Sequence, residues 1–234
     1  MRRYDTLELI RRWRELTEKL DQASVKLLAV SKYAPDDAVQ MLIDAGQSDF
    51  GESRAQQLRD RAMRWPHCAW HMIGPVQKNK AKYIGRHASM WHSCENLETA
   101  QVVARYVKER SSEQSDAVSP LPVLIQVNIA DVPAQHGIRP AAVPGFAADL
   151  MKIDGLKLAG LMCMAPKGGD AAQAFQALSS LRETLLNGCF ADVGSLALCM
   201  GMSGDYEVAI GEGATMVRLG STLFGGWDVR HQDV

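Results

Sequence analysis

Short apolar segments alternate with longer amphipathic segments along most of this chain of 234 residues. Eight apolar segments predict β-strands, at residues 26–32, 48–52, 69–74, 90–95, 122–128, 156–164, 195–201 and 216–222. Segments with helical periodicity separate them, at residues 36–45, 53–65, 77–87, 97–110, 140–153, 170–186 and 205–212. Because repeated strand–helix–strand units form right-handed crossovers, the alternation predicts a parallel α/β sheet.

Eight parallel strands in a chain of this length fit a single closed (β/α)₈ TIM barrel. The alternative is an open doubly wound sheet, but no glycine-rich dinucleotide turn follows the first strand. Apolar residues recur every three or four positions before that strand, which predicts that residues 1–24 form an extra N-terminal helix packed on the barrel. We expect one domain over residues 1–234, with residues 226–234 as a short tail.

Composition excludes several classes of partner. The formal net charge is −1 and the charged residues are spread along the chain, so neither nucleic acid nor a membrane surface is expected as a partner. The five cysteines are widely spaced and form no CxxC motif, which argues against disulfides and zinc and favours a cytoplasmic location. Because the helices leave no long apolar stripe exposed, we expect a monomer.

Lys32 is the first candidate for chemistry. Leu28, Val30 and Lys32 alternate along the first strand and share one face. If that face points into the barrel, the Lys32 amine lies at the C-terminal rim, where barrel enzymes build their sites, and an uncharged amine there can condense with an aldehyde. The alternative is an ordinary solvated lysine on a loop.

Two segments near the end of the chain have the composition of a phosphate site. Ser203 and Gly204 lie between the seventh strand and the next helix, and Arg218, Gly220 and Ser221 end the eighth strand. Hydroxyl groups and exposed backbone amides bind anions, and barrels usually bind phosphate with the loops after their last two strands. The alternatives are that Ser203 caps the helix at 205–212 and that Arg218 forms a salt bridge at the rim.

With these residues in view, the chain resembles the YggS/PROSC family of pyridoxal 5′-phosphate (PLP) homeostasis proteins, whose barrel is similar to the N-terminal barrel of alanine racemases. The resemblance extends from about Leu27 to Gly225. Six stretches carry it, namely LLAVSK (27–32), DFGES (49–53), WHMIGPVQKNK (70–80), GLMCMAP (160–166), MGMSGDYEVAI (200–210) and VRLGSTLFG (217–225). Their number and order make the resemblance specific.

The resemblance implies a role for each candidate residue. Lys32 would hold PLP as a Schiff base. Ser203, Gly220 and Ser221 would contact its phosphate, and Arg218 would face its pyridine nitrogen. The resemblance assigns no role to His71, Gln77 and Asn79, which it places near the same rim. Ser53 and His136 depart from the Asn and Lys that the family often has there, so no secondary contact with PLP is assigned to them.

The resemblance further implies a carrier that holds PLP and supplies it to PLP-dependent apoenzymes, with no metal and no catalytic residues. Racemases of this fold use a tyrosine base from a large C-terminal domain, and only residues 226–234 follow Gly225. The alternative is a PLP-dependent amino-acid racemase of low activity, in which a residue such as Tyr33 replaces that base. Two further alternatives are an aldolase that uses Lys32 without PLP and a barrel that has lost its ligand.

Overall fold

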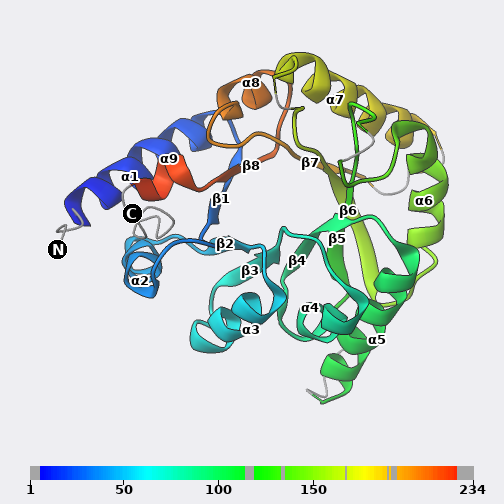
Figure 1. Cartoon of the computed structure of the whole chain (residues 1–234), viewed down its shortest axis with the longest axis horizontal. Helices are drawn as coiled ribbons and strands as arrows, with labels where there is room; N and C mark the ends of the chain where they lie inside the picture. The colour runs from blue at the N-terminus through cyan, green and yellow to red at the C-terminus, as the bar shows by residue number, and fades with distance from the viewer. Residues whose placement is uncertain are drawn as a thin grey trace.

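The structure is a computed structural model that describes residues 6–113, 119–132, 135–166, 168–188, 190 and 194–225. Its strands form one closed barrel in which all neighbours are parallel and the first strand pairs with the last (Figure 1). The strands are β1 Lys26–Val30, β2 Asp49–Glu52, β3 Ala69–Met72, β4 Met90–Cys94, β5 Leu121–Gln126, β6 Leu156–Met162, β7 Ala197–Cys199 and β8 Met216–Leu219. The predicted (β/α)₈ barrel is confirmed, and the open sheet is wrong.

Helices surround the barrel on its outer side (Figure 1). They are α1 Thr6–Gln22, α2 Asp36–Ala45, α3 Ala55–Arg64, α4 Ala81–His87, α5 Leu97–Glu113, α6 Val143–Leu150, α7 Ala171–Asn187, α8 Tyr206–Gly211 and α9 Ser221–Phe224. Two 3-10 turns, η1 Lys78–Lys80 and η2 Pro140–Ala142, precede α4 and α6. The main difference from the prediction is at residues 216–222, where the strand ends at Leu219 and Ser221 already begins α9.

The N-terminal helix is present as expected, and α1 lies beside α2 and α9 (Figure 1). It buries Leu9, Leu16 and Leu20, and the Trp13 indole donates a 2.9 Å hydrogen bond to the side chain of Gln47. Residues 1–5 and the predicted tail at 226–234 lie outside the described residues, so the single domain over the whole chain stays a prediction. Within the described part of the chain, no helix is both long and apolar enough to cross a membrane.

The barrel has an apolar layer inside its ring of strands. Leu28, Leu124, Met162, Cys199 and Met216 pack together and are almost completely buried. These residues come from β1 and from β5 to β8, so side chains from opposite walls meet across the interior, as in other filled barrels. A larger apolar core lies between the strands and the surrounding helices, where Phe50 stacks on Trp70.

A β-bulge at Gly160 interrupts the pairing of β5 with β6. Val123 is paired with Leu158, whereas Leu124 is paired with Gly160, so β6 has one extra residue at this point. Gly160 has φ +156, and a Cβ atom there would lie 2.1 Å from the carbonyl oxygen of Ala197 on β7. A glycine is therefore required for β7 to approach β6 closely enough to pair.

We predict that Gly160→Ala lowers the free energy of unfolding by about 3 kcal/mol or more, because the methyl group would force β6 and β7 apart. The measurement is chemical denaturation followed by circular dichroism. The matched control is Gly145→Ala on the exposed face of α6, where no atom lies within 4 Å of the added Cβ. This control should be neutral or stabilise by up to about 1 kcal/mol, because alanine favours helix over glycine. Equal stability of the two variants would contradict the role of Gly160.

Candidate functional site

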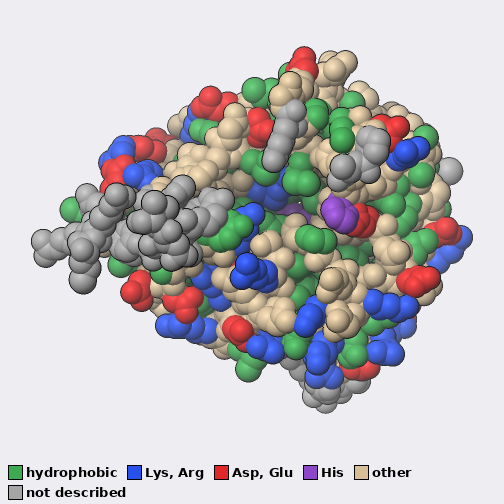
Figure 2. Space-filling view, in the orientation of Figure 1, with side chains coloured by type: hydrophobic (Ala, Val, Ile, Leu, Met, Phe, Trp, Pro, Cys, Tyr) green, Lys and Arg blue, Asp and Glu red, His purple; other side chains and the backbone are tan. Residues whose placement is uncertain are grey.

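A cavity of about 610 Å³ opens at the C-terminal rim of the barrel. This volume is within the usual range for small-molecule sites. All five residues predicted from the sequence line it, namely Lys32, Ser203, Arg218, Gly220 and Ser221. In Figure 2, basic side chains (blue) and histidine side chains (purple) lie around the hollow at the centre of the face. The structure thus brings together residues from both ends of the sequence.

The pairing of the first strand with the last explains this meeting. Leu28 is paired with Arg218 and Ala29 with Leu219, so both strands end at the same rim. A Cβ atom at Gly220 would lie 3.4 Å from the carbonyl oxygen of Val30. The loop that carries Lys32 therefore begins beside the turn that contains Gly220 and Ser221. Closure of the barrel creates the site.

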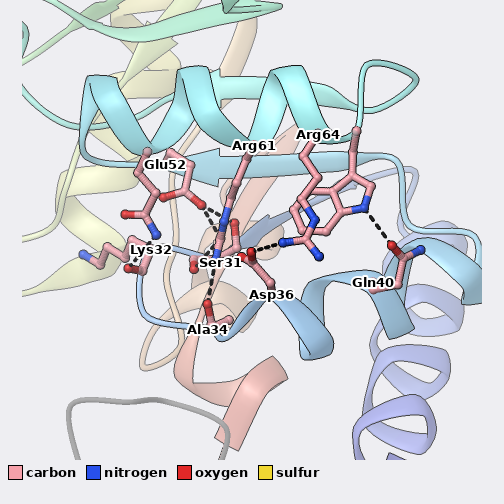
Figure 3. Close-up of polar contacts among 10 residues, drawn as sticks. Ser31, Lys32, Ala34, Asp36, Gln40, Glu52, Arg61 and Arg64 are labelled. Carbon is pink, nitrogen blue, oxygen red and sulfur yellow. Dashed lines mark hydrogen bonds and ion pairs between the residues drawn. The ribbon is translucent and has the colours of Figure 1, made fainter.

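Lys32 is half-buried on the wall of the cavity, two residues beyond the end of β1. Its Nζ atom lies 5.1 Å from the centre of the Tyr33 ring. The side chain extends away from the polar contacts that hold its own loop (Figure 3). This position supports the predicted lysine at the rim over a lysine in open solvent.

A buried group of polar contacts fixes the loop between β1 and α2 (Figure 3). The Arg61 guanidinium, from α3, donates to the carbonyl oxygens of Ser31 and Ala34, at 2.8 Å and 2.6 Å. It also donates to the carboxylate of Glu52 at 2.5 Å, and the Ser31 hydroxyl donates to the same carboxylate oxygen at 2.6 Å. Backbone groups on both sides of Lys32 are thereby held by one side chain.

Arg61 and Glu52 are an ion pair almost closed to solvent, with 6% and 0% of their side chains exposed. Burial raises the pKa of the Glu52 carboxyl, and the charge of Arg61 and the hydrogen bond from Ser31 act in the opposite direction. Neither residue of this pair is among those predicted from the sequence. One signal was present in the sequence. Arg61 has the helical spacing that places it on the same face of α3 as the apolar residues Ala55 and Leu58, and this face is buried.

The two predicted phosphate loops are bonded to each other. The Thr222 N–H donates to the Ser203 hydroxyl at 3.1 Å, and the Thr222 hydroxyl donates to the Ser203 carbonyl oxygen at 3.3 Å. Ser203 does not cap the helix that follows, so that alternative is wrong. Instead, α8 begins after Asp205, whose carboxylate accepts a hydrogen bond from the Met202 N–H at 2.6 Å.

Arg218 is buried, with 5% of the residue exposed, and reaches the cavity from β8. Its guanidinium donates to the carbonyl oxygens of Cys199 and Cys163, at 2.8 Å and 2.9 Å. Arg218 forms no ion pair within the part of the chain that the structure describes, so the predicted alternative of a salt bridge at the rim is wrong. The carbonyl oxygens at the C-terminal ends of β6 and β7 thus orient the guanidinium, and no described carboxylate forms an ion pair with it.

Ser53 and His136, the two departures from the family pattern, also line the cavity. His136 is on the outer side, with 67% of its side chain exposed, and its Nδ1 atom lies 2.8 Å from the Glu95 carboxylate. Neither residue was assigned a role from the sequence. Both are within the site. Ser53 belongs to the stretch DFGES (49–53), whereas His136 is in none of the six stretches that carry the resemblance.

His71, Gln77 and Asn79 do not line the cavity, although Ile73, Gly74 and Pro75 of the same motif do. Gln77 and Asn79 are exposed around η1. His71 is buried in the barrel, where its Nε2 atom lies 3.1 Å from the Asp49 carboxylate and its Nδ1 atom lies 2.9 Å from Nε2 of His92. Both imidazoles come from strand positions that point inward and lie below the cavity.

Comparison with known proteins identifies relatives over most of the chain. The family model for the alanine racemase N-terminal domain matches residues 5–228. A pyridoxal phosphate homeostasis protein from Pseudomonas aeruginosa is 39% identical over 211 residues, covering 89% of this chain and 87% of that protein. PipY of Synechococcus elongatus, solved with PLP bound, superimposes with a TM-score of 0.79 at 30% identity, covering 93% of this chain and all (100%) of PipY.

A more distant structure shares the fold alone. An alanine racemase from Clostridium difficile has a TM-score of 0.73 at 13% identity, and the match covers 93% of this chain and 56% of the racemase.

We predict that Arg61→Met lowers the free energy of unfolding by about 3–5 kcal/mol, because Glu52 would be left as a buried, uncompensated charge. The measurement is denaturant unfolding at neutral pH. Arg64→Met is the matched control on the same helix, since Arg64 is 56% exposed and pairs with Asp36 at the surface. It should cost less than about 1 kcal/mol. Similar losses in the two variants would show that the buried pair is not the main anchor of this loop.

We also predict that stability falls as the pH decreases below about 6.5. Burial lowers the pKa of His71, against the effect of Asp49, and lowers the pKa of His92 well below 6.5. The unfolded chain therefore binds protons that the folded chain does not, which costs at most about 1.4 kcal/mol per imidazole by pH 5.5. Unfolding measured from pH 8 to 5 tests this. The surface variant His67→Gln should keep the same slope, and a stability independent of pH over this range would contradict the prediction.

Proposed function

Because this chain belongs to the alanine racemase N-terminal domain family, and within it to the pyridoxal phosphate homeostasis proteins, we propose that it binds PLP in the cavity at the C-terminal rim. One observation carries the proposal. A single cavity is lined by a half-buried lysine from the first strand–helix loop and by the hydroxyl- and glycine-containing turns after the last two strands. A relative of the same fold, PipY, has been solved with PLP bound.

The residues of the cavity fit the chemical groups of PLP. The Lys32 amine is the nucleophile available on the wall to form a Schiff base with the aldehyde. The hydroxyls of Ser203 and Ser221 and the backbone at Gly220 provide hydrogen-bond donors for the phosphate. The Arg218 guanidinium, fixed by two carbonyl oxygens, would face the pyridine nitrogen.

The acidic residues near the phosphate loops do not oppose this assignment. Asp205 accepts a hydrogen bond from the Met202 N–H, and Glu207 forms an ion pair with Lys19 of α1. Neither carboxylate is among the residues that line the cavity. An anion at Ser203 and Ser221 would therefore avoid close repulsion from these two groups.

We further propose that the protein is a carrier that holds PLP without efficient catalysis and supplies it to apoenzymes. Bound PLP offers an electron sink whose strength depends on a protonated ring nitrogen. Arg218 is permanently protonated and cannot accept a proton, so it favours the unprotonated ring and a weaker sink. The half-buried position of Lys32 suits exchange of PLP with solvent. The cytoplasmic location and the monomeric state stay predictions.

We predict that the purified protein acquires a near-visible absorption band with PLP and that Lys32→Ala abolishes this band while the fold is retained. The band reports the Schiff base, which requires the Lys32 amine. The measurement is an absorption spectrum before and after borohydride reduction, followed by peptide mapping of the reduced lysine. Lys78→Ala is the control, because Lys78 is exposed, pairs with Glu98 and does not line the cavity.

Several outcomes would contradict the proposal. Reduced PLP on Lys78 or Lys80 would refute the assignment to Lys32. A protein that stays colourless with PLP would refute PLP binding and favour the aldolase alternative. Rapid racemisation of L- or D-amino acids by the PLP-loaded protein, measured by chiral chromatography, would refute the carrier proposal and favour the racemase alternative.

A further inference from the structure

A file of polar side chains runs through the interior of the barrel, from its N-terminal end to the cavity. Consecutive members are 2.6–3.3 Å apart, in the order Lys26, Asp49, His71, His92, Cys199 and Arg218. Most of the file is closed to solvent, since His71, His92 and Cys199 have at most 2% of their surface exposed. Only the last member, Arg218, lines the cavity and has a role in the proposed function. The other members are polar residues to which no role has been assigned.

The direction of the hydrogen bonds in the file is fixed by Asp49, which is ionised. Burial opposes the charge of Asp49, but hydrogen bonds from His71, Lys26 and Ser48 outweigh burial and hold the pKa of its carboxyl well below the usual range. An ionised carboxylate only accepts hydrogen bonds. The nitrogen of His71 that faces Asp49, Nε2, must therefore carry the proton.

Neutral imidazoles transmit this choice along the file. Burial lowers the pKa of both histidines, so each has one N–H at neutral pH. With its proton on Nε2, His71 accepts at Nδ1 from the Nε2–H of His92, 2.9 Å away. His92 then accepts at Nδ1, and the Cys199 thiol is the donor 3.3 Å away. These tautomers are assigned from the hydrogen-bond partners.

The end of the file is a sulfur atom that accepts from Arg218. Burial raises the pKa of the Cys199 thiol, against the effect of Arg218, so the sulfur keeps its proton and directs it toward His92. Nη1 of Arg218 lies 3.2 Å from the sulfur. Together with the carbonyl oxygens of Cys199 and Cys163, this contact occupies the barrel-facing side of the guanidinium. The remaining N–H groups of Arg218 have no partner among the described residues.

We propose that His92 and Cys199 are positioning residues, which hold Arg218 in the orientation that faces the pyridine nitrogen of PLP. The inference rests on the proposed function for its ligand. Every hydrogen bond in the file points toward Asp49, so the thiol proton is committed to His92 and the sulfur lone pairs are left for Arg218. A uniquely directed network restricts the guanidinium more than a water-filled interior would.

The first test is the PLP affinity and spectrum of Cys199 variants. Cys199→Ala should weaken PLP binding about tenfold, because one hydrogen bond to a charged group is lost. It should also move the pH midpoint of the absorption band of bound PLP to higher pH, because a less ordered Arg218 places less positive charge beside the ring. Cys199→Ser keeps a donor and an acceptor and should restore both values. Cys94→Ala, which removes a buried thiol that is not a member of this file, is the matched control and should behave as the unmodified protein.

The second test needs no PLP and no substitution. In protein labelled with ¹⁵N-histidine, the nitrogen chemical shifts should show His71 and His92 neutral at pH 7 with the proton on Nε2. Nδ1-protonated His92, or a charged imidazole at either position, would overturn the directed file even if a Cys199 variant failed to fold. A Cys199→Ala variant that folds and keeps the affinity and pH midpoint would overturn the positioning role. By contrast, an unmodified protein that binds no PLP would refute the proposed function. The nitrogen chemical shifts do not depend on PLP, so the two failures can be distinguished.

Discussion

Closure of the parallel sheet is the constraint on which the rest of this structure depends. Because β1 must pair with β8, the carboxyl ends of the first and last strands meet at one rim, and the loop with Lys32 lies beside the turn with Gly220. No local feature of either segment would bring them together. Gly160 has a part in this closure, because only a residue without a side chain lets β7 approach β6.

The site combines an accessible surface with rigid support behind it. Arg61 holds the backbone on both sides of Lys32, and the bond between Thr222 and Ser203 joins the two loops proposed to bind phosphate. Arg218 is fixed from the strand side by carbonyl oxygens and a sulfur atom. The Lys32 loop, Ser203 and Arg218 are thus oriented by atoms that no ligand needs to contact. Such pre-orientation reduces the entropy lost when a ligand binds.

The sequence alone predicted the barrel and placed its five site residues correctly around one cavity, because strand periodicity and the order of motifs are local properties. It could not predict what holds them. Arg61, His92 and Cys199 come from separate strands and helices, and their partnerships arise only when the barrel closes. Ser203 shows the same limit, since helix capping is a local rule and its hydroxyl is bonded to Thr222, which is distant in sequence. The chemical roles of the five residues stay predictions.

The four described cysteines, Cys68, Cys94, Cys163 and Cys199, are all buried. Burial raises the pKa of each thiol, and none of the four lines the cavity. Thiolates add readily to aldehydes, so an exposed one would compete with an amine for a reactive carbonyl. By withdrawing these sulfur atoms from solvent, the fold keeps the described cysteines from forming a hemithioacetal with an aldehyde such as the proposed ligand.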